Sequence, residues 1–263
     1  MPEFENQRML DSRFHHVDLS GSTIRDANLS RVDIRGSYAQ GLRMRGTMLV
    51  DCQIDGEIIG LRVNGIDVSA YVESELDRQD PRRRQVRNPR TLEELAAAFD
   101  LMESLWEETV ARARTFPAEQ LDERVDDEFS FIETLRHLVF AHDCWVARGI
   151  LREPAPWHPL SLPWEEAEEV AEVPCDRAAR PSLDEVLEIR ADRLARVRRV
   201  LSELTPERLD EPIQPPDTPG YVGADQHDPI GDALRTVLNE EWYHRLFAER
   251  DLSLLSSESE ASA

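Results

Sequence analysis

The chain has 263 residues, of which 53 are Asp or Glu and 31 are Lys or Arg, so its formal net charge at pH 7 is −22. This length allows one or two domains, and an apolar content of 40% is enough to bury a core, which excludes a wholly disordered chain. Binding to nucleic acid or to an anionic membrane surface requires a basic face. We therefore expect neither a nucleic-acid partner nor a membrane partner.

The N-terminal residues carry neither the basic nor the apolar segment of a secretory signal, and no apolar run approaches the roughly 20 residues that span a bilayer. Cys52, Cys144 and Cys175 are odd in number and widely spaced. We expect free thiols and a cytoplasmic location. Every basic residue is Arg, since the sequence contains no Lys, and this indicates a gene from a GC-rich bacterium.

Large apolar residues recur at every fifth position at the start of the chain. A period of five fits neither a helix nor a flat strand, whereas it fits a square coil with five residues on each side, two of them pointing inward. The segment Asp26-Ala27-Asn28-Leu29-Ser30 is close to the consensus of the pentapeptide-repeat family, which residues 1–69 resemble. The resemblance implies a short right-handed quadrilateral β-helix of about three coils. Eleven of the twelve repeat centres are large and apolar: Phe4, Met9, Phe14, Leu19, Ile24, Leu29, Ile34, Met44, Leu49, Ile54 and Ile59.

The end of this β-helix is marked by Asn64-Gly65, which stands between two short apolar segments and predicts a hairpin that caps the coil. Residues 70–90 then predict a short helix and a linker. The arginine run 82–84 in this linker could bind phosphate, but a solvated linker is favoured.

The charge of the first domain bears on its partners. Residues 1–69 contain ten acids and eight arginines, a net charge of −2. Some pentapeptide-repeat proteins mimic DNA through an acidic coil and protect gyrase, and this nearly neutral coil disfavours that role. We expect a structural or dimerising role instead.

Capping boxes predict the helices of the second domain. The fourth helix follows Pro229 and is expected to end near Leu252, so residues 91–252 predict a four-helix bundle and 253–263 a disordered tail. The crossover loops are long and rich in proline, and such loops often cover binding sites. The boxes begin at Thr91, Ser130 and Ser182, and the helices they open end near Phe116, Leu151 and Leu204.

Facing helices of the bundle carry candidate metal ligands. Glu240 and His244 are four residues apart on the fourth helix and share one face. His137 on the second helix would complete a set of three protein ligands with an open position, which is the catalytic zinc pattern. Alternatives remain open, because a Glu/His pair at this spacing is often a surface ion pair, Glu241 also reaches His244, and His137 could be a core histidine.

Two motifs resemble the ligand motifs of the DinB-like superfamily, in particular its branch with mycothiol-dependent maleylpyruvate isomerase. They are Glu133-Thr-Leu-Arg-His-Leu-Val and Asn239-Glu-Glu-Trp-Tyr-His-Arg. The resemblance implies a homodimeric bundle in which His137, Glu240 and His244 hold a divalent metal ion. Zinc is expected first, and nickel, iron or manganese also suit these ligands.

The chemistry implied by the resemblance is thiol S-transfer or isomerisation of a small electrophile. Mycothiol is the expected cosubstrate, because the resembled branch is actinobacterial and the absence of Lys fits a GC-rich source of that kind. Trp157 and Trp164 would then cover the bound electrophile, and His142 and Arg136 would act as catalytic groups beside the metal. The alternative is a non-catalytic metal-binding regulatory protein whose β-helix dimerises or recruits a partner.

Overall fold

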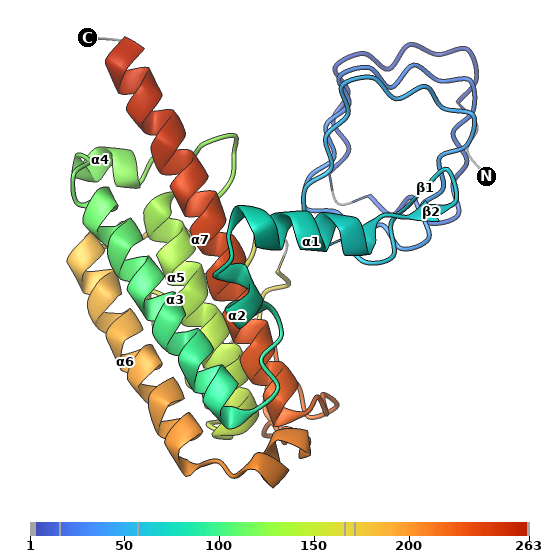
Figure 1. Cartoon of the computed structure of the whole chain (residues 1–263). Coiled ribbons are helices and arrows are strands. Elements are labelled where there is room, and N and C mark those ends of the chain that lie inside the picture. Colours follow the sequence, from blue (N-terminus) through green and yellow to red (C-terminus); the bar gives the residue numbers. More distant parts are fainter. Residues whose placement is uncertain (1–3, 16, 57, 166, 171, 262–263) are drawn as a thin grey trace. The chain divides into compact units, whose positions relative to one another are not determined.

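The computed structural model divides into two compact units, Met1–Ile59 and Gly60–Ala263. The first is a coil of short turns and the second is built mainly of helices (Figure 1). The division falls before residue 69, because the hairpin continues directly into the first helix. The structure describes residues 4–15, 17–56, 58–165, 167–170 and 172–261.

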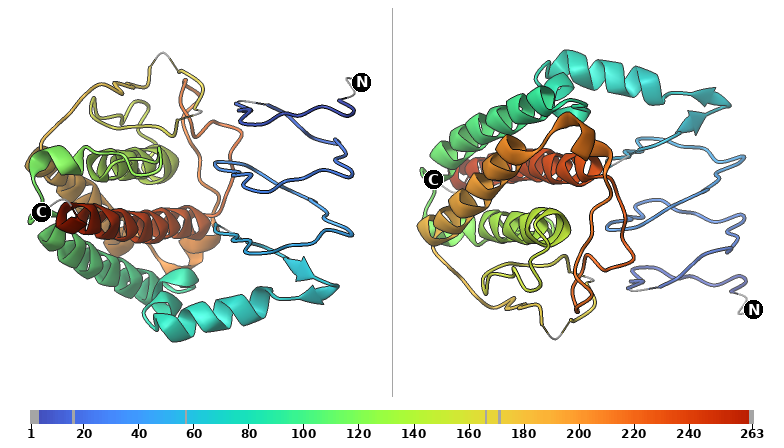
Figure 2. Two further views of the ribbon diagram at one scale, coloured as in Figure 1. Left: turned by 90° about the horizontal axis from the view of Figure 1, so that it is seen from above. Right: turned by 90° about the horizontal axis from the view of Figure 1, so that it is seen from below.

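The coil repeats its backbone conformation every five residues, and Figure 2 shows its successive loops stacked on one another. Leu19 O accepts a hydrogen bond from Ser22 N, and the residue between them with positive φ is Gly21, as a type II turn requires. This confirms the period of five, while the number of coils stays a prediction. Positive φ angles recur at Asn6, Asp11, Gly21, Asp26, Arg31, Gly36, Gly41, Gly46, Asp51 and Gly56.

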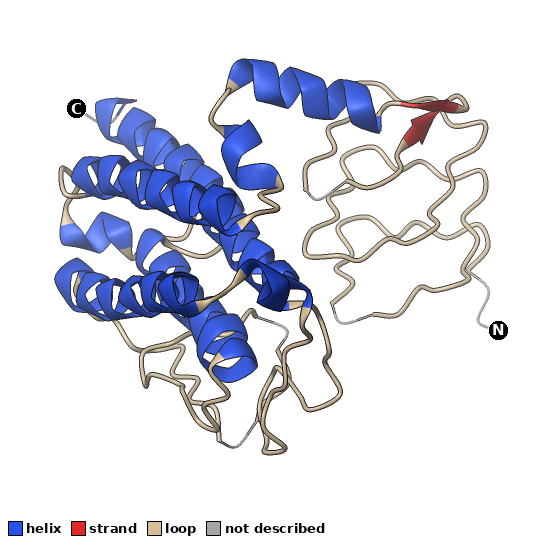
Figure 3. Ribbon diagram, turned by 60° about the horizontal axis from the view of Figure 1, so that its bottom comes forward, coloured by secondary structure: helices blue, strands red, loops and turns tan. Residues whose placement is uncertain are grey.

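The expected packed interior of this coil is not found. The large apolar repeat centres are exposed, from 44% at Met9 to 87% at Ile59. Among the described residues of this unit no strand forms (Figure 3), so no ladder of backbone hydrogen bonds draws neighbouring coils to the close spacing of a sheet. The turns alone carry the periodicity.

The predicted hairpin is confirmed as strands β1 (Arg62–Val63) and β2 (Ile66–Asp67), which pair antiparallel. Asn64 and Gly65 between them both have positive φ, the requirement of a type I′ turn. Helix α1 (Ser69–Gln79) follows, and the short helix α2 (Arg83–Arg87) lies where a linker was expected.

The arginine run is not a solvated linker throughout. The Arg83 side chain is buried and its Nη1 donates to Glu73 at 2.9 Å and to Asp77 at 2.8 Å. Arg87 adds bonds to the same two carboxylates. Helix α2 also packs against two bundle helices, which removes Arg83 from solvent.

Four long helical segments form the bundle. The three predicted capping boxes are present at Thr91, Ser130 and Ser182, where each hydroxyl accepts from the N3 backbone and the N3 glutamate accepts from the cap backbone. The segments are α3 (Leu92–Ala113), α5 (Phe131–His142) continuing as the π-helical segment η1 (Asp143–Ile150), α6 (Leu183–Glu203) and α7 (Ile230–Ala261).

Helix α5 is the central element. All twelve of its residues are buried, because it packs against α6 and α7 (Figure 1). A helix that is buried all round places its polar side chains inside the protein, where each requires a partner. The contacts of the polar side chains of α5 are therefore the starting point for locating a functional site.

Helix α7 is longer than predicted, and the end expected near Leu252 is wrong. Leu252 and Leu255 are buried, and the hydroxyl of Ser256 donates to Leu252 O. These contacts extend the helix through a segment whose polar composition predicted disorder. No helix among the described residues combines the length and the apolarity that crossing a membrane would require.

Two fully buried arginines hold the crossover loops. Arg136 of α5 donates to three backbone carbonyls of the connection 151–182. Arg148 of η1 donates to Pro154 O of that connection and to Val222 O and Thr218 O of the connection 204–229. Gly220 gives this guanidinium its space, since a Cβ there would lie 2.6 Å from Arg148 Cζ.

Candidate metal centre

Three side chains from two helices converge on one point. His137 projects from α5, and Glu240 and His244 project one turn apart from α7. Glu240 Oε2 lies 3.4 Å from His137 Nε2 and 3.3 Å from His244 Nδ1. One ligand atom from each residue lies within 4.8 Å of the others. We call these three residues the His–Glu–His cluster.

Hydrogen bonds assign the ring protons of both histidines. His137 Nδ1 lies 3.0 Å from Leu162 O, and His244 Nδ1 lies 2.9 Å from Glu240 O. A carbonyl oxygen only accepts, so each Nδ1 carries a proton. In the neutral form each Nε2 is therefore a free lone pair, as a metal-ligating imidazole requires.

The ionisation states of the cluster side chains also favour metal binding. Burial opposes ionisation of Glu240, but His137 and His244 hold the pKa of Glu240 below its usual range. Burial and the neighbouring His137 lower the pKa of His244, which keeps its imidazole neutral. Metal ions bind the carboxylate and the neutral imidazole forms of these side chains.

Glu240 Oε2 is a buried oxygen without a hydrogen-bond donor in the described part of the chain. A carboxylate oxygen in this position is unfavourable unless a cation compensates it. The donor set of two imidazoles and one carboxylate fits a divalent transition metal such as zinc. His244 and Glu240 are only partly buried, so the cluster is open on the side of α7.

The structure separates Glu241 from the cluster and so resolves the choice between the two glutamates. Glu241 is buried on another face of α7, where Oε1 lies 2.8 Å from His142 Nε2 and Oε2 lies 2.8 Å from Arg190 Nη2. Burial opposes ionisation, but Arg190 and His142 lower the pKa of Glu241 to about 2. We call these three residues the buried triad.

Among the described residues, neither His142 nor Arg136, which were predicted to be catalytic, has a side-chain hydrogen bond to a residue of the cluster. His142 belongs to the buried triad, and its partner is Glu241 rather than a cluster residue. The three guanidinium nitrogens of Arg136 are bonded to loop carbonyls. Both side chains are therefore committed to packing inside the protein, since α5 is buried on every face.

Trp157 and Trp164 form an aromatic cluster with Phe140 and Tyr221. Phe140 is central, with ring centroids 5.7 Å from Trp157, 6.1 Å from Trp164 and 5.1 Å from Tyr221. Phe140 also lies 6.0 Å from the ring of His137. An apolar wall therefore extends from the His–Glu–His cluster to Trp164, which is 43% exposed.

Sequence reasoning missed three members of this site. Phe140 lies three residues after His137, so helical spacing could have placed it on the same face. Tyr221 lies in a distant loop and carries no local signal. The Leu162 carbonyl belongs to the backbone, and no residue type predicts its use.

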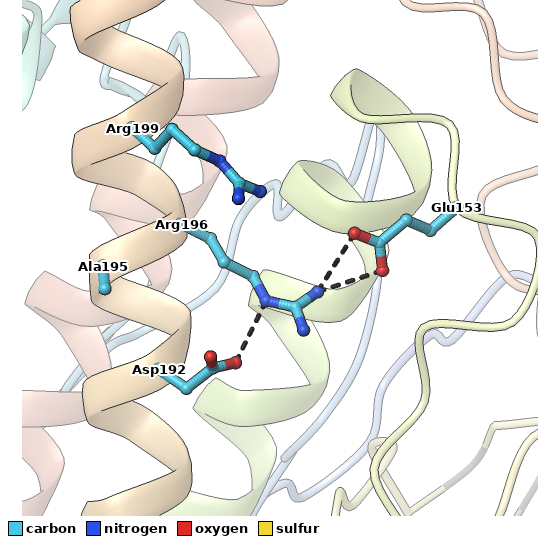
Figure 4. Close-up of a pocket in the computed structure, with 5 residues that line it drawn as sticks. All are labelled: Glu153, Asp192, Ala195, Arg196 and Arg199. Atoms are coloured by element: carbon cyan, nitrogen blue, oxygen red, sulfur yellow. Dashed lines mark hydrogen bonds and ion pairs between the residues drawn. The ribbon is translucent and has the colours of Figure 1, made fainter.

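A hollow of about 300 Å³ lies elsewhere on the bundle and contains no cluster residue (Figure 4). Arg196 in this hollow is held by Glu153 at 3.0 Å and by Asp192 at 3.0 Å. Its charge is already balanced by these acids, so the hollow is a surface ion-pair site. It is lined by Glu153, Asp192, Ala195, Arg196 and Arg199.

Comparison with family models gives two matches. Residues 101–248 match the DinB superfamily, and residues 4–55 match eight copies of the pentapeptide repeat. The first match includes the three cluster residues. The repeats indicate a β-helix for the first unit. A comparison with curated proteins gave no match.

Proposed function

Because the chain belongs to the DinB superfamily, whose members bind divalent metal ions, we propose that it is a metal-dependent thiol S-transferase or isomerase. The proposed substrates are a small apolar electrophile and a low-molecular-weight thiol, for which mycothiol is our first candidate. The proposed metal is zinc, with nickel, iron and manganese as alternatives that suit the ligands. The proposal includes a cytoplasmic homodimer.

One observation carries this proposal: the buried Glu240 Oε2 has no hydrogen-bond donor among the described residues and lies 3.4 Å from His137 Nε2, the nitrogen left free when the neutral ring donates its Nδ1 proton to Leu162 O. His137, Glu240 and His244 would hold the ion. Three protein ligands leave a coordination position for a substrate, whereas structural zinc sites use four. A divalent ion bound there would lower the pKa of a thiol and so supply a thiolate at neutral pH.

The remaining steps depend on side chains of this chain. The wall of Phe140, Trp157, Trp164 and Tyr221 offers apolar surface beside His137 for the electrophile and excludes water from it. Glu240 stays ionised and His244 neutral at pH 7, so neither needs to lose a proton before the ion binds. In the transfer, the thiol sulfur forms a bond to an electrophilic carbon while that carbon loses its bond to a leaving group or, in an unsaturated electrophile, a π bond. The atom that takes this electron pair, or the solvent, receives the thiol proton.

The test is a metal analysis followed by a thiol-consumption assay. We expect about one divalent ion per chain, and consumption of mycothiol with an added electrophile that stops on chelation and returns with metal. His244→Ala removes a cluster ligand, and His227→Ala is the matched control because His227 is exposed and outside the cluster. Metal-free protein, or equal activity in both variants, would contradict the proposal.

A second candidate function is non-catalytic, with the coil binding a protein partner. It is favoured by exposed apolar side chains outside the repeat centres, such as Tyr38 at 89% and Met48 at 87%. This candidate predicts bound metal without any thiol consumption. Acidic mimicry of DNA stays disfavoured, because the coil is nearly neutral.

A further inference from the structure

We propose that Arg136 is a positioning residue, which holds loop segment 160–162 against α5 so that the Leu162 carbonyl fixes the ring of His137. This inference rests on the proposed function, because it concerns how a ligand of the proposed metal is oriented. Arg136 was expected to be a catalytic group beside the metal, and the structure places its guanidinium in contact with the loop.

Segment 160–162 is joined to two consecutive residues of α5. Arg136 Nε donates to Leu160 O at 2.8 Å, and Leu162 N donates to Arg136 O at 3.2 Å. His137 Nδ1 then donates to Leu162 O at 3.0 Å. These three bonds place the carbonyl that accepts the His137 proton.

The same guanidinium also reaches the other end of the connection. Its Nη1 donates to Ala179 O at 3.0 Å and its Nη2 donates to Asp176 O at 2.5 Å. Arg136 is fully buried, and these acceptors are all backbone carbonyls. A planar fork with several fixed donors can join two limbs of a loop, whereas a lysine ammonium is a single point of attachment.

The consequence for His137 is a fixed tautomer. When the Nδ1–H of His137 is hydrogen-bonded to Leu162 O, the other ring nitrogen, Nε2, lies 3.4 Å from Glu240 Oε2. Partners that orient a ligating histidine in this way typically change metal affinity or activity 10–100-fold when they are removed. Leu162 O cannot be removed by substitution, so Arg136 is the side chain through which the arrangement is tested.

The chain provides a matched control for this test. Arg148 is also fully buried and also bonds to loop backbone carbonyls, but in the described part of the chain none of these carbonyls is hydrogen-bonded to a cluster residue. Arg136→Met and Arg148→Met therefore remove equally buried guanidinium groups from two loop anchors. Only the first should disturb His137.

Two readouts on the full chain separate positioning from general destabilisation. In metal-free, ¹⁵N-labelled protein near pH 8, we expect long-range ¹H–¹⁵N spectra to show His137 as the Nδ1–H tautomer, with its signal assigned by loss in His137→Gln. Arg136→Met should shift that signal toward the Nε2–H tautomer and should raise the Kd for Zn²⁺ about 10-fold or more. Arg148→Met should leave both unchanged.

Circular dichroism establishes that each variant is folded. If Arg136→Met does not fold, Arg136→Lys replaces it and should give a shift in the same direction. The inference is overturned if wild-type His137 is not the Nδ1–H tautomer, if the Arg136 variants behave as wild type, or if Arg148→Met has the same effects. A wild-type protein with the Nδ1–H tautomer that binds no metal would refute the proposed function and leave the positioning role standing.

Discussion

Two groups that each contain histidine and glutamate project from helices α5 and α7, and their carboxylates lie in different surroundings. The His–Glu–His cluster uses His137, Glu240 and His244, and the buried triad uses His142 and Glu241 with Arg190. Glu240 and Glu241 are neighbours in sequence, yet one faces an opening and the other faces the core. The two groups differ in what compensates the carboxylate.

In the buried triad, both carboxylate oxygens of Glu241 have a partner at 2.8 Å, and one of these partners is a guanidinium. Arg190 also lies over the ring of Trp106, with Cζ 5.0 Å from the centroid. The negative charge is therefore balanced by the protein itself. A group of this kind stabilises one arrangement of the helices, and neither carboxylate oxygen of Glu241 is left for a metal ion.

In the His–Glu–His cluster, no arginine reaches Glu240, and its buried Oε2 has no hydrogen-bond donor among the described residues. The two imidazole protons are hydrogen-bonded to backbone carbonyls, which leaves His137 Nε2 free to face this oxygen. The comparison indicates that histidine and glutamate side chains form a candidate metal-ligand set where no arginine balances the charge of the carboxylate. Three predictions test this difference.

The largest expected effect is on folding stability. Glu241→Ala leaves Arg190 as an uncompensated buried charge and should lower the free energy of unfolding by about 3–5 kcal/mol. Glu240→Ala removes a partly exposed carboxylate and should cost less than about 1 kcal/mol without metal. Urea unfolding with a chelator, followed by far-ultraviolet circular dichroism, measures both. Equal losses would contradict the division between the two groups.

The second prediction concerns metal affinity. Glu240→Gln should weaken Zn²⁺ binding by at least about 100-fold, the upper end of the loss seen for groups that only orient a ligand. His142→Gln should bind Zn²⁺ within a few-fold of wild type, since its partner is Glu241. Isothermal titration calorimetry on metal-depleted protein distinguishes them. A comparable loss in both variants would make the triad part of the metal site.

Much of the fold was predictable because its signals are local. The capping boxes at Thr91, Ser130 and Ser182 involve contacts three residues apart, and all three formed. The spacing of Glu240 and His244 put them on one helix face, and the turn at Asn64-Gly65 followed from two residues. Such signals depend on contacts between residues that are close to one another in the sequence.

The rest depends on contacts between distant segments. Arg83 is buried by α2 packing on the bundle, and nothing in a run of arginines predicts which one will be covered. Leu162 enters the site through its carbonyl, which every residue type possesses. The extension of α7 follows from burial of Leu255, which depends on what packs against that helix end.

The last and smallest expected effect links the cluster to stability. An ion that binds only the folded chain stabilises it by RT ln(1 + [L]/Kd), about 1.4 kcal/mol at a free concentration ten times Kd. For the second unit this corresponds to a rise in Tm of about 3–6 °C.

His142→Gln should melt at a lower temperature than wild type but show the same rise, because the triad contributes stability and not ligands. His137→Ala should lose the rise, because it removes a ligand from the cluster. A rise that depends on His142 as much as on His137 would show that the two groups act as one site, and the absence of a donor to Glu240 could then no longer be taken as the mark of a ligand.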